Sequence, residues 1–302
     1  MVNKGKGIIL AGGSGTRLYP ITIGVSKQLL PIYDKPLLYY PISTLMEMGI
    51  RDILIICKSE DKLQFEALLN NGEHFGINLE YAIQDEPNGI AEAFIIGEEF
   101  IGEDNVTLIL GDNLYFSPTI KKIKPFDESE TSKCRVFGCQ VSDPRRYGVA
   151  VFDEDCNLTN IEEKPEIPKS DIAITGLYQY TNDVVKFAKT MKPSSRGELE
   201  ITDVNNLYID SENIEIKILA DGTAWLDAGT VESLHDASSF VKTIQDRQGI
   251  KFGCPESIAF KRRWISPTKM KQYLEDKPNI EYYTYLHQLL NKKGKSCNQF
   301  LS

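Results

Sequence analysis

Short apolar runs alternate with helix-like segments through the first half of the sequence, and this alternation restricts the fold more than any other feature. The apolar runs, which we interpret as strands, are residues 7–11, 53–57, 79–83 and 106–110. The amphipathic segments between them, which we interpret as helices, are residues 37–48, 62–69 and 90–100. Strands that are apolar along their whole length are typical of a largely parallel sheet covered by helices on both faces. Ligands of such sheets bind at the carboxyl ends of the strands.

The alternation weakens after residue 126. Strand-like runs occur at residues 136–141, 149–152 and 172–180, a hairpin turn is expected at residues 153–155, and helical spacing dominates from Glu232 onward. We therefore predict an α/β fold with a Rossmann-like, mostly parallel central sheet flanked by helices, a smaller mixed-sheet lobe and a C-terminal helical extension. Because one hydrophobic core stops growing at about 250 to 300 residues, we expect the core with its lobe at residues 1–240 and the extension at residues 241–302.

The formal net charge of -9 at pH 7 argues against nucleic-acid and anionic-membrane partners, and an anionic small substrate would need a local positive pocket. Neither a nucleic acid nor an anionic membrane would be attracted to such a surface overall. No apolar run approaches the roughly 18 residues needed to span a bilayer. The 6 cysteines are scattered, without the paired spacing or the histidine arrangement of a zinc site. We expect a cytoplasmic protein with reduced thiols.

A glycine-rich segment directly follows the first predicted strand. It consists of Gly12, Gly13, Ser14, Gly15, Thr16 and Arg17. Glycines let backbone N–H groups approach phosphate oxygens, and the arginine adds a bidentate cation, so the segment suits a polyphosphate. A dinucleotide fingerprint would need glycine or alanine at Leu18, and a P-loop would need Gly-Lys-Ser/Thr at residues 15–17. By itself the segment is equally consistent with a tight connection.

Two aspartates provide a candidate metal site. Asp112 follows the fourth predicted strand, where a buried strand meets a ligand-binding edge, and Asp227 is a second candidate. Two carboxylates together with phosphate oxygens suit Mg²⁺, which prefers hard oxygen ligands. Lys27 adds a cation near the glycine-rich segment, and Lys164 and Glu163 are candidates for binding an acceptor phosphate and its hydroxyls. Taken singly, each of these residues is more often a cap, a turn or a solvated residue.

Several segments, taken together in their order and spacing, carry a resemblance to one family. They are residues 12–17, 26–31, 111–113, 146–149, 162–165, 197–203 and 225–230. In combination they resemble the glucose-1-phosphate thymidylyltransferases, from about residue 7 to residue 256. The resemblance implies an enzyme that makes dTDP-glucose and pyrophosphate from dTTP and glucose-1-phosphate by in-line attack on the α-phosphorus. It also implies a Mg²⁺-dependent, cytoplasmic homotetramer that is feedback-inhibited by a deoxythymidine-diphosphate sugar.

The resemblance implies roles for individual residues as well. Catalysis is expected from Arg17, Lys27, Asp112, Lys164 and Asp227, with Asp112 and Asp227 as the ligands of Mg²⁺. The nucleotide is expected to contact Leu10, Gly12, Gly13, Ser14, Gly15, Thr16, Arg17, Lys27 and Gln28, with Gln84 and Gly89 at the pyrimidine edge. The sugar phosphate is expected to contact Asn113, Tyr147, Gly148, Glu163, Lys164, Ile174, Tyr178 and Arg196.

The sequence departs from the family pattern at a few positions. Ala228 stands where threonine is usual and Ile174 where valine is usual, and both changes are small. Ser117 and Pro118 replace a usual Gly-His pair beside the family's regulatory nucleotide site. This departure concerns the regulatory site and leaves the catalytic motifs unchanged.

Three other functions stay open at this point. The same chemistry could use UTP or another sugar-1-phosphate, because a methyl group such as the one on thymine is worth only about 1 to 3 kcal/mol. A non-catalytic nucleotide-sugar sensor would not need the charged set of Arg17, Lys27, Asp112, Lys164 and Asp227, which is complete here. A dinucleotide-dependent oxidoreductase would need the third glycine that the loop lacks.

Overall fold

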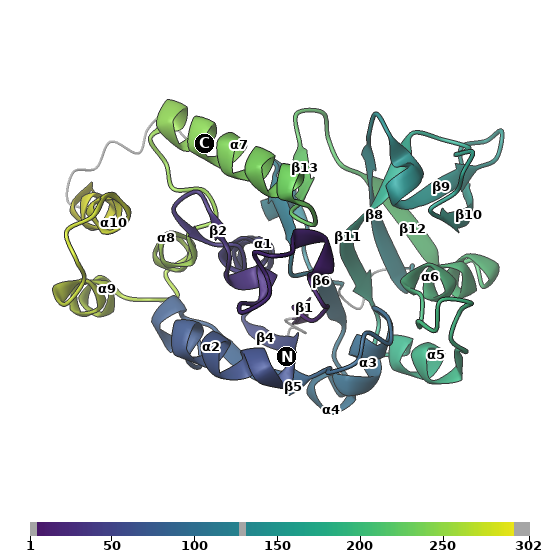
Figure 1. Cartoon of the computed structure of the whole chain (residues 1–302), viewed down its shortest axis with the longest axis horizontal. Helices are drawn as coiled ribbons and strands as arrows, with labels where there is room; N and C mark the ends of the chain where they lie inside the picture. Colours follow the sequence, from purple (N-terminus) through teal and green to yellow (C-terminus); the bar gives the residue numbers. More distant parts are fainter. Residues whose placement is uncertain (1–4, 127–130, 293–302) are drawn as a thin grey trace.

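The computed structural model describes residues 5–126 and 131–292, in which nine strands form one continuous sheet (Figure 1). These strands are β1 (Lys6–Leu10), β4 (Asp52–Cys57), β5 (Asn78–Ile83), β6 (Val106–Leu110), β8 (Cys134–Gln140), β9 (Gly148–Phe152), β10 (Leu158–Glu163), β11 (Ile172–Tyr180) and β12 (Ile214–Ile218). The main path across the sheet has the order β10-β9-β11-β6-β1-β4-β5, and β8 pairs with both β11 and β12.

Four neighbouring strands, β6, β1, β4 and β5, are parallel and coincide with the four predicted apolar runs. Their carboxyl ends lie at one edge of the sheet. The amide of Ala11, just after β1, donates to the carbonyl of Ile56 in β4 at 2.7 Å, and the amide of Gly111, just after β6, donates to the carbonyl of Leu10 at 2.9 Å. The loops that follow β1 and β6 therefore begin side by side.

The predicted smaller lobe is an extension of the central sheet. β11 runs antiparallel to β6, with Leu177 opposite Ile109, so the first residues of β11 continue past the end of β6. β8 and β9 both pair with β11, and β10 pairs with β9 across the predicted hairpin turn, where Asp153 accepts from the amides of Asp155 and Asn157. The lobe consequently overhangs the carboxyl edge of the parallel strands.

Helices cover both faces of the sheet, as the apolar strands predict. They are α1 (Tyr39–Met48), α2 (Ser59–Leu69), α3 (Glu92–Ile96), α4 (Glu98–Ile101), α5 (Val184–Thr190), α6 (Ile201–Asp210), α7 (Val231–Gln248), α8 (Pro255–Lys261), α9 (Pro267–Glu275) and α10 (Glu281–Lys292). Successive strand residues point to opposite faces. Ile9 belongs to the core cluster formed with α1, α2, α8, α9 and α10, whereas Ile8 belongs to the cluster formed with α3, α5 and α6.

The segment predicted as one helix over residues 90–100 forms two short helices, α3 and α4, separated by Gly97. A Cβ at Gly97 would lie 2.9 Å from the side chain of Ile8 and 3.0 Å from the carbonyl of Ala93. The backbone is thus pressed against the sheet at this point, and only glycine fits.

Two short antiparallel ribbons lie outside the main sheet. One pairs β2 (Pro31–Ile32) with β3 (Lys35–Pro36), and the other pairs β7 (Asn113–Phe116) with β13 (Ala224–Asp227). α7 begins directly after the second ribbon, where Thr230 caps it by accepting from the amide of Ser233 at 3.2 Å. The ribbon thereby joins two chain segments that are more than a hundred residues apart.

The C-terminal helices α8, α9 and α10 extend the molecule on the side opposite the β9–β10 hairpin (Figure 1). α8 packs on α1, and its residues Ile258, Ala259 and Phe260 belong to the same core cluster as Leu45 of α1. The predicted boundary at residue 240 falls within α7, and the division into a core and an extension stays a prediction. Residues 293–302 of the predicted extension lie outside the described residues.

None of the helices in the described ranges has the length and apolar character that crossing a bilayer requires. Cys57, Cys134, Cys139, Cys156 and Cys254 all have free thiols, as the scattered spacing predicts. Cys297 lies outside the part of the chain that the structure describes.

Candidate active site

The glycine-rich segment follows β1 at the carboxyl edge of the sheet, and its last two residues, Thr16 and Arg17, begin a short 3₁₀ helix. Gly13 and Gly15 have φ angles of 105° and 59°, in the region that favours glycine. A Cβ at Gly13 would meet nothing within 4 Å, so its backbone borders open space. Gly15 is held in place because the hydroxyl of Thr22 donates to its carbonyl at 2.8 Å. The loop thus presents its backbone to a space beside it.

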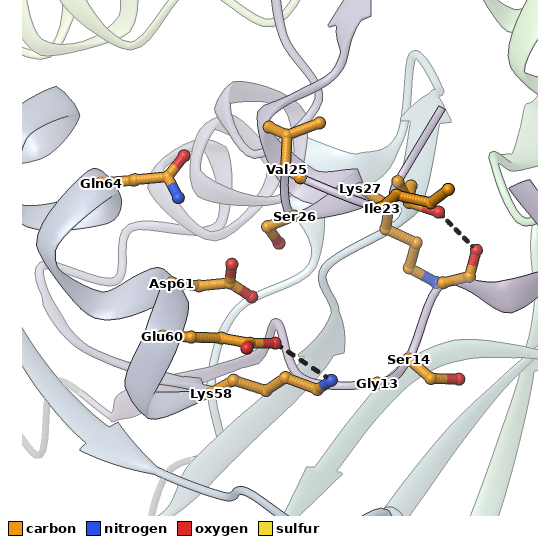
Figure 2. Close-up of a pocket in the computed structure, with 13 residues that line it drawn as sticks. Gly13, Ser14, Ile23, Val25, Ser26, Lys27, Lys58, Glu60, Asp61 and Gln64 are labelled. Carbon is orange, nitrogen blue, oxygen red and sulfur yellow. Dashed lines mark hydrogen bonds and ion pairs between the residues drawn. The ribbon is translucent and has the colours of Figure 1, made fainter. Parts of the chain in front are cut away.

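That space is a cavity of about 160 Å³ between the loop and α2 (Figure 2). Its lining includes Gly13, Ser14, Gly15 and Lys27 of the predicted nucleotide site. Figure 2 shows Lys58 extending toward Gly13 from the start of α2, where its ammonium lies 3.4 Å from the carboxylate of Glu60. The cavity therefore combines exposed backbone with two lysines, which suits phosphate oxygens.

A larger cavity of about 540 Å³ lies under the overhanging lobe. It collects eleven of the predicted site residues: Arg17, Asp112, Asn113, Tyr147, Gly148, Glu163, Lys164, Ile174, Tyr178, Arg196 and Asp227. Lys27 lines the first cavity and forms an ion pair with Asp112, which lines the second. The ion pair between Lys27 and Asp112 therefore connects the two cavities.

The β7–β13 ribbon brings the two aspartates together. Asp227 ends β13 opposite Asn113 of β7, and the amide of Ala228 donates to the carbonyl of Asp112 at 2.9 Å. A Cβ at Gly229 would lie 3.2 Å from the guanidinium of Arg17 and 3.4 Å from the carboxylate of Asp227. Gly229 therefore leaves room for Arg17 beside the aspartates.

Asp112 is held on both carboxylate oxygens. Lys27 donates to Oδ2, and the Asn113 amide donates to Oδ1 at 2.8 Å. The indole N–H of Trp225 in turn donates to Oδ1 of Asn113 at 2.6 Å, which fixes the direction of that amide. Burial alone would raise the pKa of Asp112, but the charge and hydrogen bonds of Lys27 and Asn113 outweigh it and lower the pKa. Asp112 stays a fixed anion.

Asp227 has the opposite shift. Burial raises the pKa of its carboxyl, and the neighbouring charge of Asp112 adds to this effect. Arg146 at 3.5 Å, the Tyr147 hydroxyl at 3.1 Å and Arg17 counteract it only in part. Burial and the adjacent Asp227 also raise the pKa of Tyr147 to about 12, so its hydroxyl remains a donor.

In the lining of the large cavity, Glu163 at the end of β10 is surrounded by donors. The hydroxyl of Thr202 donates to its carboxylate at 2.7 Å, and the cationic groups of Lys164 and Arg196 lie 3.0 and 3.5 Å away. Burial would raise the pKa of Glu163, but these partners hold it below its usual value. Lys164 has a φ of 46°, an uncommon conformation for a residue other than glycine that tends to occur at functional sites.

The chain is similar to the proteins of one known family. A family model described as nucleotidyl transferase matches residues 6–244. The chain belongs to this family.

Two relatives narrow the family assignment to the glucose-1-phosphate thymidylyltransferases. The glucose-1-phosphate thymidylyltransferase of Neisseria meningitidis serogroup A is 53% identical over 287 residues, which cover 95% of this chain and 100% of the relative. The glucose-1-phosphate thymidylyltransferase of Mycolicibacterium smegmatis is 50% identical over 289 residues, with 95% and 100% coverage. The resemblance predicted from the sequence motifs is confirmed, and the protein is an enzyme of the nucleotidyltransferase class.

Solved structures agree with the fold. A Bacillus anthracis protein described as a glucose-1-phosphate thymidylyltransferase in complex with a sucrose is 39% identical, with a TM-score of 0.71 over 78% of this chain and 94% of that chain. A UDP-glucose pyrophosphorylase complexed with UDP-glucose is 24% identical, with a TM-score of 0.69 over 80% of this chain and 99% of that chain. The second likeness concerns the fold alone.

The remaining predicted nucleotide residues of this nucleotidyltransferase are not part of the lining of either cavity. Leu10 ends β1, Gly12 and Thr16 flank residues 13–15 in the chain, and Gly89 lies on the loop that follows β5. Gln28 is buried and accepts from the Ser26 hydroxyl at 2.8 Å. Gln84 follows β5 directly and is also buried.

Sequence reasoning did not single out several residues that the site contains. Arg146 and Trp225 contact predicted site residues, as described above, and both stood inside motifs that carried the resemblance. Thr202 orients Glu163 through a hydrogen bond between residues 39 positions apart. Lys58 gave no signal in the sequence, because a single lysine at a helix start is usually solvated.

In the nucleotidyltransferase, Ser117 and Pro118 line a third cavity of about 560 Å³ between β7, α1 and α8. The Ser117 hydroxyl lies 3.0 Å from the hydroxyls of both Thr119 and Thr223. The departure from the family pattern therefore lies at a real cavity, and feedback inhibition there stays a prediction.

Proposed function

We propose that the protein transfers the thymidylyl group of dTTP to glucose-1-phosphate, giving dTDP-glucose and pyrophosphate. The observation that carries the proposal is the ion pair between Lys27 and Asp112, which joins a phosphate-sized cavity to a larger one lined by sugar-phosphate candidates. The relatives at 50% and 53% identity support the choice of substrates.

The triphosphate belongs at the glycine loop. Backbone N–H groups of residues 12–16 would donate to phosphate oxygens, while Arg17 and Lys27 offset the negative charge that develops on pyrophosphate as it leaves. Leu10, Gln28, Gln84 and Gly89 would contact the nucleoside. Lys27 and Lys58 line the cavity beside the glycine loop, and Arg17 lines the adjoining large cavity.

The donor set fits Mg²⁺. The described residues contain no group of three or more His, Cys, Asp or Glu side chains placed to hold a metal, and we propose Asp112 and Asp227 as the two carboxylate ligands. Mg²⁺ is usually bound by one or two carboxylates with water and substrate phosphates. Burial, and to a lesser extent the charge of Asp112, raises the pKa of Asp227, and a divalent cation between the two carboxylates would stabilise their ionised forms. Bound there, Mg²⁺ would neutralise charge on the triphosphate.

The acceptor belongs in the large cavity. Lys164 and Arg196 would bind the phosphate of glucose-1-phosphate, and Glu163 would accept hydrogen bonds from sugar hydroxyls. Asn113, Tyr147, Gly148, Ile174 and Tyr178 would complete the sugar's surroundings. Lys164 and Arg196 reduce the repulsion between the two anionic substrates, which is required before one can attack the other.

The reaction needs no covalent enzyme intermediate. A phosphate oxygen of glucose-1-phosphate forms a bond to the α-phosphorus, and the bond from that phosphorus to the β-phosphate oxygen breaks as pyrophosphate leaves. Because the attacking oxygen is already anionic, no strong general base is required, and catalysis comes from alignment and charge neutralisation. No histidine is needed in any role.

A second candidate is the same transfer with UTP or another sugar-1-phosphate. The UDP-glucose pyrophosphorylase structures share the fold, and thymine and uracil differ by one methyl group. By resemblance, we also propose that the enzyme is a cytoplasmic homo-oligomer, a tetramer in the family pattern.

The test is a matrix of pyrophosphate-release assays over nucleoside triphosphates and sugar-1-phosphates, with and without Mg²⁺. We expect dTTP with glucose-1-phosphate and Mg²⁺ to give the highest kcat/KM. Asp112→Asn should reduce kcat by about 100-fold or more while leaving the unfolding temperature within a few degrees. Release at the wild-type rate by Asp112→Asn would show that Asp112 has no part in metal binding, and a preference for another pair would replace the substrate assignment.

A further inference from the structure

Arg146 contacts one of the two aspartates from the lobe. It ends a short 3₁₀ helix, Pro144–Arg146, on the connection between β8 and β9. Its guanidinium lies 3.5 Å from Oδ2 of Asp227, and the hydroxyl of the next residue, Tyr147, donates to Oδ1 of the same carboxylate at 3.1 Å. Two successive residues of the lobe therefore contact both oxygens of a carboxylate that belongs to the β7–β13 ribbon.

The contact between Arg146 and Asp227 is loose. The Arg146 side chain is 48% exposed and lines the large cavity. A guanidinium carries five N–H donors. Among the residues that the structure describes, no carboxylate other than that of Asp227 lies within ion-pair distance of this guanidinium, which otherwise contacts the ring of Tyr147. Because a partly exposed ion pair contributes little stability, Arg146 can leave Asp227 easily and has donors free for an anion.

The cation beside the other aspartate is held more firmly. Lys27 and Asp112 both have side chains that are only 15% exposed. Asn113 donates to the second oxygen of Asp112 at 2.8 Å and fixes that carboxylate further. Each aspartate thus has a cationic side chain beside it, and the one beside Asp227 is the more exposed and the easier to displace.

A divalent cation bound to Asp227 would compete with Arg146 for this carboxylate. Tyr147 contacts one oxygen and Arg146 the other, so a new ligand of the carboxylate has to replace one of them. The Tyr147 hydroxyl is neutral, whereas the guanidinium is always charged and would be repelled by the arriving cation. Arg146 is therefore the group that has to move.

We propose that Arg146 occupies the position on Asp227 that Mg²⁺ takes, and that the displaced guanidinium binds phosphate oxygens where the two cavities meet. The proposal rests on the proposed function, in which Asp227 is a metal ligand. In that reaction the α-phosphorus lies between the triphosphate at the glycine loop and the acceptor in the large cavity, and so beside the two aspartates. There the guanidinium of Arg146 would offset the charge on the α-phosphoryl oxygens.

Arg146→Gln tests the proposal, because it removes the charge and keeps a polar side chain. We expect the Kd for Mn²⁺, measured without either substrate by electron paramagnetic resonance of the free ion, to fall at least about threefold, since the competing cation is gone. We expect kcat/KM for dTTP in the presence of Mg²⁺ to fall at least about tenfold. The metal thus binds more tightly while the reaction becomes slower, whereas general damage to the site would weaken both.

Arg145→Gln is the matched control. Arg145 lies on the same 3₁₀ helix and carries the same charge, but its guanidinium donates to both carboxylate oxygens of Asp143, at 2.7 and 2.9 Å. Its replacement should leave the Kd for Mn²⁺ within about twofold of the wild-type value. Arg146→Lys keeps the charge, so we expect a Kd for Mn²⁺ close to the wild-type value and a partial recovery of kcat/KM. If Arg146→Gln does not fold, Arg146→Met is measured in the same way with the same expected changes.

A Kd for Mn²⁺ that is unchanged or raised in Arg146→Gln overturns the proposal, and so does a tighter Mn²⁺ site with an unchanged kcat/KM for dTTP. Asp227→Asn distinguishes this failure from that of the proposed function. If Asp227→Asn binds Mn²⁺ as tightly as the wild-type enzyme, the metal site of the proposed function is contradicted. If Asp227→Asn loses Mn²⁺ binding while Arg146→Gln keeps the wild-type Kd, the role of Arg146 alone is contradicted.

Discussion

Glu163 shows how single residues set the charge of the site. Its carboxylate is half-buried and has a lowered pKa, because Thr202, Lys164 and Arg196 stabilise the ionised form more than burial destabilises it. A group with a lowered pKa keeps its charge as the pH falls, until the pH reaches that lower pKa. The enzyme should therefore hold sugar hydroxyls through Glu163 well into the acidic range.

Thr202→Val removes the uncharged donor and keeps the shape of the side chain. Without that hydrogen bond the pKa of Glu163 rises, so its charge is lost at a higher pH than in the wild-type enzyme. We expect kcat/KM for glucose-1-phosphate to begin its acidic decline at a higher pH, measured from about pH 4 to pH 7, and to fall a few-fold at neutral pH. The kcat/KM for dTTP at saturating sugar phosphate should change less.

Thr159→Val is the control for this substitution. Thr159 lies on β10, the same strand as Glu163, but its hydroxyl donates to the carbonyl of Val151 at the exposed side of the hairpin. Its replacement should leave the pH profile unchanged. An unchanged profile in Thr202→Val would mean that Lys164 and Arg196 alone set the charge of Glu163.

Much of the site at this scale could be predicted from the sequence, and the limits have a physical reason. Gly13, Asp112 and Asp227 lie in motifs whose chemistry is visible in a few neighbouring residues. The orientation of Asp112 depends on the amide of Asn113, and that amide is fixed by Trp225. Asn113 and Trp225 are 112 positions apart in the chain. A hydrogen bond of that span has no signature in local spacing.

At the scale of elements, the antiparallel strand β11 forms part of the wall of the large cavity. Between Ile174 and Tyr178 its pairing with β8 shifts register, and Gly176 lies within this irregular stretch. A Cβ at Gly176 would lie 2.7 Å from the amide oxygen of Asn113 and 2.8 Å from the side chain of Leu110. The absence of a side chain at this strand position lets Asn113 approach and hold Asp112.

Gly176→Ala should therefore damage both stability and catalysis. Asn113 is buried and bonded to Asp112 and Trp225, so it cannot yield without breaking those bonds. Overpacking of a buried site costs about 1 to 3 kcal/mol, and we expect that loss in the free energy of unfolding together with at least a tenfold fall in kcat. Denaturant unfolding and pyrophosphate release measure the two effects.

Gly24→Ala is the comparison for the stability effect. Gly24 has no positive φ, and a Cβ there would meet nothing within 4 Å, so the free energy of unfolding should stay within about 0.5 kcal/mol of the wild-type value. If Gly176→Ala were as stable and as active as the wild-type enzyme, the position of Asn113 would not depend on the close approach at Gly176.

The predicted elements agree with the structure wherever the pattern is local. The four parallel strands were apparent as apolar runs, and α1 and α2 as amphipathic segments. The joining of β11 to β6 and the β7–β13 ribbon depend on pairing between distant segments, which periodicity cannot show. The break at Gly97 depends on contact with Ile8, another long-range effect.

For the molecule as a whole, the C-terminal helices are held together by one buried carboxylate. Glu256 of α8 is 1% exposed and accepts from the hydroxyls of Tyr273 in α9 at 3.0 Å and Tyr282 in α10 at 2.6 Å. Burial and the charge of Glu256 raise the pKa of both tyrosines, so each hydroxyl remains a donor. All predicted site residues lie between Leu10 and Asp227, outside these helices.

Glu256→Ala should thus separate stability from catalysis. It leaves two hydroxyls without their acceptor, one of them buried, and we expect the free energy of unfolding to fall by about 2 to 4 kcal/mol. Glu256→Gln, which keeps an acceptor oxygen, should lose less of this free energy, and Glu275→Ala on the exposed side of α9 should lose almost none.

The folded fraction of each variant should keep the wild-type kcat, because the helices add no group to the active site. A Glu256 variant that is stable but has a reduced kcat would show instead that α8, α9 and α10 influence the catalytic cavity, and that the core at residues 1–240 does not work independently of them.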